Sequence, residues 1–522
     1  MMGTANFSSE FVRCENKFTS FSRFSTNPIV EPIFFVLGSP GTFSEMKNAA
    51  QQGVQILHNL TPEIVAARPA TAGSSAINLE RVAEFAPGLA HSQSQIHKLL
   101  SDLATMHLHG VFSPFDSHLV KVRTDAARAV VITDNIDPML PALAPMLGSE
   151  QPRKYLIAFQ NPAEARGTGG IIGAYAIVSA DKGRIKIDHV GPDTEFIPAN
   201  SVPISMPQDF QTLYGEDPSI WQNSNLSPNF PDAAKIWLAL WKKQSGQSLD
   251  GVIALDPYLL KQVLLVAGPL QVDRQEITAN NVIAQTLSLN YIRYANDNTA
   301  RKEFLVAILK AALNRMLHFH LSASNLLTIF SNPVKENRID LYSAHQSEQQ
   351  FIESTSLSHL LPLKRDNSYR LIINNTAGNK MDYYLARSVT IASESCGKSP
   401  TTRVDFTLEN TVKINEKLPS YVVGRLDLQK PRGDANSTSV EAMLFGPVGS
   451  QILGAEDVAT GQSPGVQSTE NSHPVLVSSL ELKPGVPVHI AVEFSGGVGP
   501  LENIVQPLVN DEKVSITDRC SR

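Results

Sequence analysis

The sequence predicts a multidomain protein of α and β structure, with an N-terminal helical segment, a central α/β domain built on a mixed sheet and a C-terminal β-sandwich. Three observations support this fold class. The 522 residues exceed what one hydrophobic core usually organises. The apolar residues change from a helical period to alternating strands and helices, and then to a period of two. A composition of 42% hydrophobic and 18% charged residues is typical of a folded chain rather than a disordered one.

The first 149 residues divide into an irregular leader and a helical segment. Residues 1–40 are rich in Phe, Ser and Asn without a helical period, which predicts a leader without regular structure. Residues 41–149 carry apolar side chains at steps of three, four and seven, which predicts helices that pack on one another. The clearest series is Leu89, Ile96, Leu99, Leu103 and Met106.

Residues 150–364 alternate between short apolar runs and helical patterns, which predicts an α/β domain with a mixed sheet. The expected strands are 155–159, 171–178, 184–190, 251–255 and 270–272. The expected helices are 231–243, 257–266, 278–294 with Thr278 as N-cap, and 301–317. Turn-forming residues at Asn161-Pro162 and at 167–170 are expected to end the first strand.

Residues 365–522 predict a β-sandwich, because short segments with apolar residues at every second position are separated by Pro/Gly turns. The expected strands are 369–373, 402–408, 440–445 and 488–494. The stretch 454–474 is rich in Gly, Ser, Thr and Gln and is expected to form one long exposed loop.

The three cysteines are Cys14, Cys396 and Cys520. None belongs to a CxxC pair, so the sequence does not support a structural zinc or a thioredoxin-like site. Cys396 and Cys520 bracket the C-terminal part, and we expect a disulfide between them, as is typical of an oxidising compartment. The alternative is two buried free thiols.

The charge and the hydropathy of the chain argue against nucleic-acid binding and against a membrane-spanning helix. A formal charge of -6 gives no electrostatic reason to bind nucleic acid, which favours basic surfaces. No stretch approaches the roughly 18 apolar residues of a spanning helix, and no secretory signal pattern is present. Attachment to a membrane would therefore need an anchor that is not visible in this chain.

Several motifs, met in order, resemble one known family. They are QNPAEARGTGG at 160–170, LDGVIALDP at 249–257 followed by AGPL at 267–270, NKMDYY at 379–384 and LPSYV at 418–422. These stretches resemble the bacterial cell-envelope family catalogued as domain of unknown function 4012. The resemblance runs from about residue 41 to the end and implies an extracytoplasmic, envelope-associated protein. Members of that family usually carry one N-terminal membrane helix, which this sequence does not show.

The order of elements is also distantly similar to that of the LytR-CpsA-Psr transferases, which attach polyprenyl-pyrophosphate-linked glycopolymers to the bacterial wall. Arg166 falls at the arginine of that family's second motif, Pro192-Asp193-Thr194 on the third, and Tyr291-Ile292-Arg293 with Arg301 on the last. The resemblance implies that Arg166, Arg293 and Arg301 bind the pyrophosphate from around one cleft.

The sequence departs from that family where the transferases supply carboxylates for magnesium. Asn161 and the run Gly167-Thr168-Gly169-Gly170 stand at those two positions. A neutral amide and glycines do not provide the charged oxygen ligands that magnesium prefers. The sequence therefore predicts no cofactor and argues against magnesium.

The remaining residues leave two interpretations open. The backbone N–H groups of Gly169 and Gly170, with the arginines, could bind a phosphate; alternatively, the glycines form a tight turn that allows close packing, with Arg166 exposed. Glu164 and Asp193, together with Arg166, are the candidate catalytic residues for acid/base or metal chemistry. Their alternative is a role as surface or helix-capping acids.

The resemblances imply an extracytoplasmic protein that handles a polyprenyl-pyrophosphate-linked envelope or exopolysaccharide glycan. It would be a phosphoglycosyl or glycopolymer transferase, or else a non-catalytic binding or scaffold protein with a degenerate transferase site. No GxSxG, HExxH, Walker or GxGxxG motif supports another enzyme class. The expected partners are the glycan and, through an anchor, the membrane, and not nucleic acid.

Overall fold

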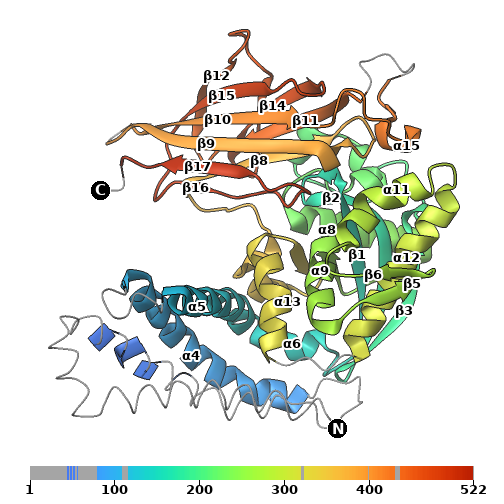
Figure 1. The fold of residues 1–522 in the computed structure, drawn as a ribbon, viewed down its shortest axis with the longest axis vertical. Coiled ribbons are helices and arrows are strands. Elements are labelled where there is room, and N and C mark those ends of the chain that lie inside the picture. Colours follow the sequence, from blue (N-terminus) through green and yellow to red (C-terminus); the bar gives the residue numbers. More distant parts are fainter. Residues whose placement is uncertain are drawn as a thin grey trace.

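The computed structural model describes residues 79–107, 116–318, 323–397, 399–428 and 436–520, with short pieces between residues 44 and 56. The leader expected over residues 1–40, and Cys14 within it, lie outside the described residues. The chain is a mixed α and β structure, as predicted, with the helical segment at one end and the C-terminal sheets at the other (Figure 1).

A five-stranded mixed sheet lies at the centre of residues 150–364. Its strands are β1 (Arg153–Arg166), β2 (Gly169–Asp181), β3 (Arg184–Pro192), β4 (Gly251–Leu255) and β7 (Ile339–Ser343), in the order β3-β2-β1-β4-β7. β1 pairs antiparallel with β2 and parallel with β4, and the outer pairs are antiparallel. A separate hairpin joins β5 (Leu270–Val272) to β6 (Gln275–Ile277).

Both faces of the mixed sheet are covered by helices. This explains the uninterrupted apolar run near the start of β1, because a strand that is buried on both faces carries apolar side chains on each. Tyr155, Ile157 and Phe159 of β1 pack with α9 (Pro257–Ala267), α12 (Asn298–His318) and α13 (Ala323–Lys335). Leu156 and Ala158 face the other way, toward α8 (Phe230–Ser245). Of the shorter helices, α14 (Gln346–Glu353) contacts β7 of the same sheet, whereas α7 (Gln208–Tyr214) contacts strand β13 (Val466–Glu470) of the C-terminal part.

The prediction of a helix over 278–294 is wrong at its first residues, because the helix begins four residues later. It begins at α10 (Val282–Ala284), continues as a π-helical turn over Gln285–Leu289 and ends as α11 (Asn290–Arg293). The side-chain oxygen of Asn281 accepts a hydrogen bond from the N–H of Thr278 at 2.8 Å. The N-cap position of the helix is Asn281, three residues after Thr278.

The helical segment consists of α4 (Leu79–Thr105), α5 (Asp116–Ile136) and α6 (Leu140–Met146). Ile96, Leu99 and Leu103 of α4 pack against Leu119 and Ala126 of α5, as the apolar stripe predicts. α5 also contacts α13 of the α/β part (Figure 1). Among the helices of the described residues, none combines the length and the hydropathy needed to cross a membrane.

Two five-stranded sheets form the C-terminal part. The first has the order β12-β15-β10-β9-β17 and the second β13-β14-β11-β8-β16. The facing sides of both sheets enclose one apolar core that includes Tyr369, Phe406 and Phe494. The strands are β8 (Ser368–Asn375), β9 (Leu385–Ser395), β10 (Thr401–Asn410), β11 (Thr438–Phe445), β12 (Gln451–Asp457), β13 (Val466–Glu470), β14 (His473–Leu482), β15 (Val488–Ser495), β16 (Glu502–Asn503) and β17 (Lys513–Thr517). A short helix, α15 (Ser420–Val423), lies between β10 and β11.

The expected loop over 454–474 is also wrong, because this stretch contains most of β12 and all of β13. Both are edge strands with one neighbour, β12 beside β15 and β13 beside β14. An edge strand with solvent-facing side chains needs few apolar residues, so its Ser, Thr and Gln content conceals it from a search for alternating apolar positions.

The first strand does not end at Asn161-Pro162 as expected. β1 continues to Arg166, and the pairing with β2 jumps between Asn161 and Ala165, so that residues 162–164 bulge from the strand. The N–H of Ala163 donates to the side-chain oxygen of Asn161 at 3.1 Å. Asn161 and Pro162 therefore start a bulge within β1 instead of a turn that ends the strand, and the bulge changes the direction of the strand's last residues.

A disulfide joins Cys396, just after β9, to Cys520, just after β17. This is the predicted cysteine pair. It closes a loop across a sequence separation of 124 residues and ties the last strand of the chain to the first C-terminal sheet.

Candidate functional site

A cavity of about 530 Å³ lies where the end of β1 meets the C-terminal sheets, and we call it the main cavity. Glu164, Arg166 and Asp193 line it together with Lys380 and Tyr421. Three of the residues that the sequence singled out are thus brought to one place. Most other polar lining side chains are amides or carboxylates: Asp217, Gln222, Asn223, Asn374, Asn375 and Glu441.

Glu164 lies between two cations at the wall of this cavity. Its carboxylate pairs with the ammonium of Lys380 and, at 3.1 Å, with Arg166, and all three side chains are less than 10% exposed. Burial acts to raise the pKa of Glu164, but the two adjacent cations outweigh burial and hold that pKa below its ordinary value. Burial likewise acts to lower the pKa of Lys380, and Glu164 reverses the direction. The three groups are therefore charged, and one carboxylate serves both cations, so the group keeps a net charge of +1.

Arg166 is buried rather than exposed, and the protein itself uses its donors. The guanidinium donates to the carbonyl oxygens of Gln222, Ala165 and Asn375, at 2.8 to 3.1 Å, and to side-chain oxygens of Glu164 and Asn223, both at 3.1 Å. These bonds account for all five N–H donors of an arginine. Arg166 lines the main cavity but keeps no donor for a phosphate.

The glycine run forms a tight turn and not an open anion site. Gly169 and Gly170 are buried, and the N–H of Gly170 donates to the side-chain oxygen of Gln160 at 3.3 Å. A Cβ at Gly167 would lie 2.3 Å from the carbonyl oxygen of Leu226, and one at Gly170 would lie 2.2 Å from the backbone of Asn161. The glycines are needed because neighbouring backbone packs directly against them.

The expected convergence of three arginines is wrong. Arg301 is 1% exposed, and its Cζ lies 3.4 Å from the ring centroid of Tyr421, so the tyrosine separates it from the main cavity. Arg293 is exposed and donates to the side chains of Gln285 at 3.1 Å and Gln275 at 3.3 Å, outside the cavity lining. Tyr291 faces inward, and a residue two positions further on a helix points about 200° away from it.

Asp193 lies in a 3-10 turn, Asp193–Glu195, directly after β3. Its buried carboxylate pairs with the ammonium of Lys302, the fifth residue of α12. Asp193 and Glu164 therefore line the same cavity, but each is neutralised by its own lysine. The described part of the chain contains no group of three or more His, Cys, Asp or Glu side chains that could hold a metal ion.

No role was predicted for Lys380, Asp382 or Gln506, which complete the surroundings of β1. Asp382 accepts hydrogen bonds from the N–H of Ala165 at 2.7 Å and from Asn375 at 2.9 Å, and burial raises its pKa to about 6. The amide of Gln506 donates to the carbonyl of Arg166 at 2.7 Å. Lys380 and Asp382 belong to the motif at 379–384, so the motif itself was the available signal.

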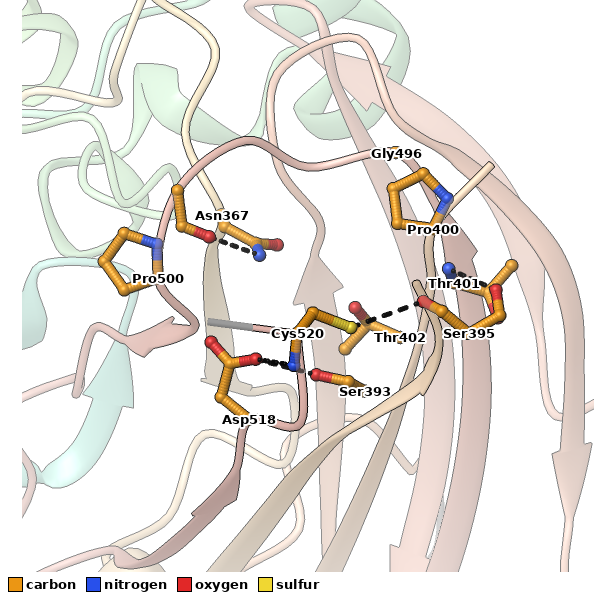
Figure 2. Close-up of a pocket in the computed structure, with 11 residues that line it drawn as sticks. Asn367, Ser393, Ser395, Pro400, Thr401, Thr402, Gly496, Pro500, Asp518 and Cys520 are labelled. Carbon is orange, nitrogen blue, oxygen red and sulfur yellow. Dashed lines mark hydrogen bonds between the residues drawn. The ribbon is translucent and has the colours of Figure 1, made fainter. Parts of the chain in front are cut away.

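A second cavity, of about 360 Å³, lies beside the disulfide (Figure 2). Hydroxyl side chains line it, and Ser393 donates to the carboxylate of Asp518 at 3.1 Å. Apart from Cys520 of the disulfide, it contains none of the residues that the motifs single out. We therefore take the main cavity as the candidate functional site.

Fold and site together define a protein with a mixed α/β sheet whose motif-bearing first strand is covered by C-terminal sheets. Residues 150–291 match the family model described as "Protein of unknown function (DUF4012)", which confirms the family that the motifs resemble over this region. No curated protein matches the chain. Among solved structures, the chain is similar to the transcriptional regulator yvhJ from Bacillus subtilis, with 12% identity over 42% of this chain and 84% of that chain, at a TM-score of 0.21.

Proposed function

We propose that this protein binds a cell-envelope glycan outside the cytoplasm, without catalysing its transfer, and that the main cavity is the binding site. One observation carries the proposal. Each cation that lines the cavity pairs with a carboxylate of the protein, whereas three polar side chains of the wall, Asp217, Glu441 and Asn374, have acceptor oxygens without a partner in the part of the chain that the structure describes. A pyrophosphate would need free cations, and a sugar needs acceptors for its hydroxyl groups.

The acceptors are Asp217, Glu441 and Asn374. Burial, and after it the charge of Asp217, raises the pKa of Glu441, so the ionised form of this carboxylate is disfavoured. The side-chain oxygen of Asn374 is buried and has no hydrogen-bond partner among the described residues. Hydroxyl groups of a sugar could donate hydrogen bonds to the carboxylates of Asp217 and Glu441 and to the unpartnered oxygen of Asn374. The two carboxylates would instead repel a phosphate, which is also negatively charged.

Tyr421 adds an apolar surface at the rim of the same cavity. Its side chain is 37% exposed, and Arg301 stacks on the ring. A ring held in place by a buried guanidinium can pack against the C–H groups of a sugar without first losing conformational entropy. Placement outside the cytoplasm rests on the Cys396–Cys520 disulfide, since such bonds persist in oxidising compartments.

The test is calorimetric titration of the full chain with ladders of one to six units of glucose, N-acetylglucosamine, glucosamine and galacturonic acid. We expect at least one ladder to bind, and Glu441→Gln to weaken that binding about tenfold because a charged acceptor is lost. Glu502→Gln is the matched control, since Glu502 is exposed on β16 and lines neither this cavity nor the one beside the disulfide.

The titration includes geranylgeranyl pyrophosphate as a probe for the transferase alternative, which is favoured only by the presence of Glu164 and Asp193 in one cavity. Failure of every ladder to bind would overturn the proposal. Tighter binding of the pyrophosphate than of every glycan would replace it with the transferase.

A further inference from the structure

We propose that the main cavity continues across the Asp193–Lys302 ion pair into a second subsite, so that the protein binds successive units of one linear glycan. This inference rests on the proposed function. The second subsite is a cavity of about 350 Å³, which we call the side cavity. Its lining comes from the turn after β3 and from α12: Val190, Pro192, Thr194, Glu195, Asn298, Thr299, Lys302, Glu303 and Val306.

Residues of one turn of the chain line both cavities. Asp193 lines the main cavity, while Pro192, Thr194 and Glu195 on either side of it line the side cavity. Lys302 lines the side cavity, and its ammonium crosses the wall to pair with Asp193. The two cavities therefore share this ion pair as their partition.

A second contact connects the cavities beside that pair. Asn298 lines the side cavity and accepts a hydrogen bond from the guanidinium of Arg301. The same guanidinium stacks on Tyr421 of the main cavity. The turn after β3 and the first turn of α12 thus touch both binding surfaces, which places the cavities next to each other on one path.

The side cavity has the same chemical character as the main cavity. Thr194, Asn298, Thr299 and two carboxylates supply hydrogen-bonding groups, and its one cation, Lys302, is paired with Asp193. Glu195 is held in position by Tyr175 at 2.6 Å and His189 at 2.7 Å. Both cavities therefore suit a ligand rich in hydroxyl groups and poor in negative charge.

The partition can open without rearrangement of the backbone. Lysine carries its charge on a flexible four-carbon stem, whereas Asp193 is part of a 3-10 turn. A glycan that crosses the wall can donate hydroxyl groups to Asp193 and accept a hydrogen bond from Lys302, so both charges keep partners. Each cavity alone is of the size of about 300–1,000 Å³ that is usual for a small ligand.

The experiment compares affinity with oligomer length, using the glucose, N-acetylglucosamine, glucosamine and galacturonic acid ladders. For wild type we expect the tetramer to bind about tenfold more tightly than the dimer. Thr299→Trp, which fills the side cavity from an exposed helix position, should reduce this ratio to about twofold or less and leave dimer affinity unchanged. Lys310→Trp is the control, because Lys310 is exposed on the same helix and lines neither cavity.

Glu303→Arg, also in the side-cavity lining, is the second variant if the tryptophan disturbs folding, and it should give the same loss of the length effect. Equal affinity of dimer and tetramer for wild type, or an unchanged ratio in both variants, would overturn the second subsite while the proposed function stands. If wild type binds no ladder at all, the proposed function fails, and this inference fails with it.

Discussion

Two regions of this protein are held together by different interactions. The core between the C-terminal sheets consists of apolar side chains such as Val404, Phe406 and Ile490, each no more than 1% exposed. The end of β1 is also buried, but it is held by charged and amide groups, chiefly Glu164 and Lys380. Apolar contacts are non-directional and tolerate repacking, whereas each buried charge needs one particular partner. Single substitutions should therefore act very differently in the two regions.

The largest effect is expected from Glu164→Gln. The substitution leaves the buried cations of Lys380 and Arg166 without their anion, which should lower the free energy of unfolding by about 3–5 kcal/mol. Denaturant titration of the purified chain measures this change.

Its control is Asp102→Asn, which removes an exposed ion pair with Lys98 and should cost less than about 1 kcal/mol. The double variant Glu164→Gln with Lys380→Met should recover part of the loss, since one unpaired charge is removed with its partner. Equal stability of Glu164→Gln and wild type would show that the end of β1 does not depend on its charges.

A smaller effect is expected from the disulfide of the C-terminal sheets. The double variant Cys396→Ser with Cys520→Ser should lower the free energy of unfolding by about 3–4 kcal/mol, because the unfolded chain regains the freedom of a long loop. Wild type measured with a reductant should match the double variant. Glycan binding at the main cavity should be unchanged, and its loss would mean that the two regions are coupled.

The smallest of the three effects is a pH dependence at Glu470, where β13 meets α7. Tyr214 and Ser227 donate hydrogen bonds to its carboxylate at 2.8 and 2.6 Å, and burial raises its pKa to about 7. The folded state therefore binds the proton more tightly than the unfolded state, whose carboxyl titrates near about pH 4.3. The stability contributed by the protonated group is complete below the unfolded pKa and is lost as pH rises through about 7.

Glu470→Gln should remove this loss and be more stable than wild type at pH 8 by about 2–3 kcal/mol, with little difference at pH 4. Thermal unfolding at the two pH values measures it, and the exposed Glu502→Gln serves as the matched control. A variant that is less stable than wild type at pH 8 would show that Glu470 is ionised and well paired when folded.

The same contrast decides how much of the fold could be predicted from the sequence. β4 was expected at its observed bounds, and the expected strands of the C-terminal sheets lie inside β8, β10, β11 and β15. These elements bury apolar side chains at a regular period, which is visible in a local window of sequence. The edge strands β12 and β13 were missed because they bury little.

The candidate site could be predicted only in part. The motif at 160–170 identified Glu164 and Arg166, and Asp193 followed from the distant resemblance. The partner Lys380 lies 216 residues from Glu164, and no local pattern connects them. Arg293 was misplaced because its motif position gave no information on which side of α11 it would face.

The bond from Gln506 to the carbonyl of Arg166 sets a lower limit on the time that assembly takes. The two residues are 340 positions apart, and a ribosome adds about 5–20 residues per second, so roughly 17–70 s pass between their syntheses. During that interval the last residues of β1 have no access to Gln506 and, for about the first two thirds of it, none to Lys380 and Asp382. The strand that is made first in the central sheet is therefore among the last parts of the molecule to reach its final bonding.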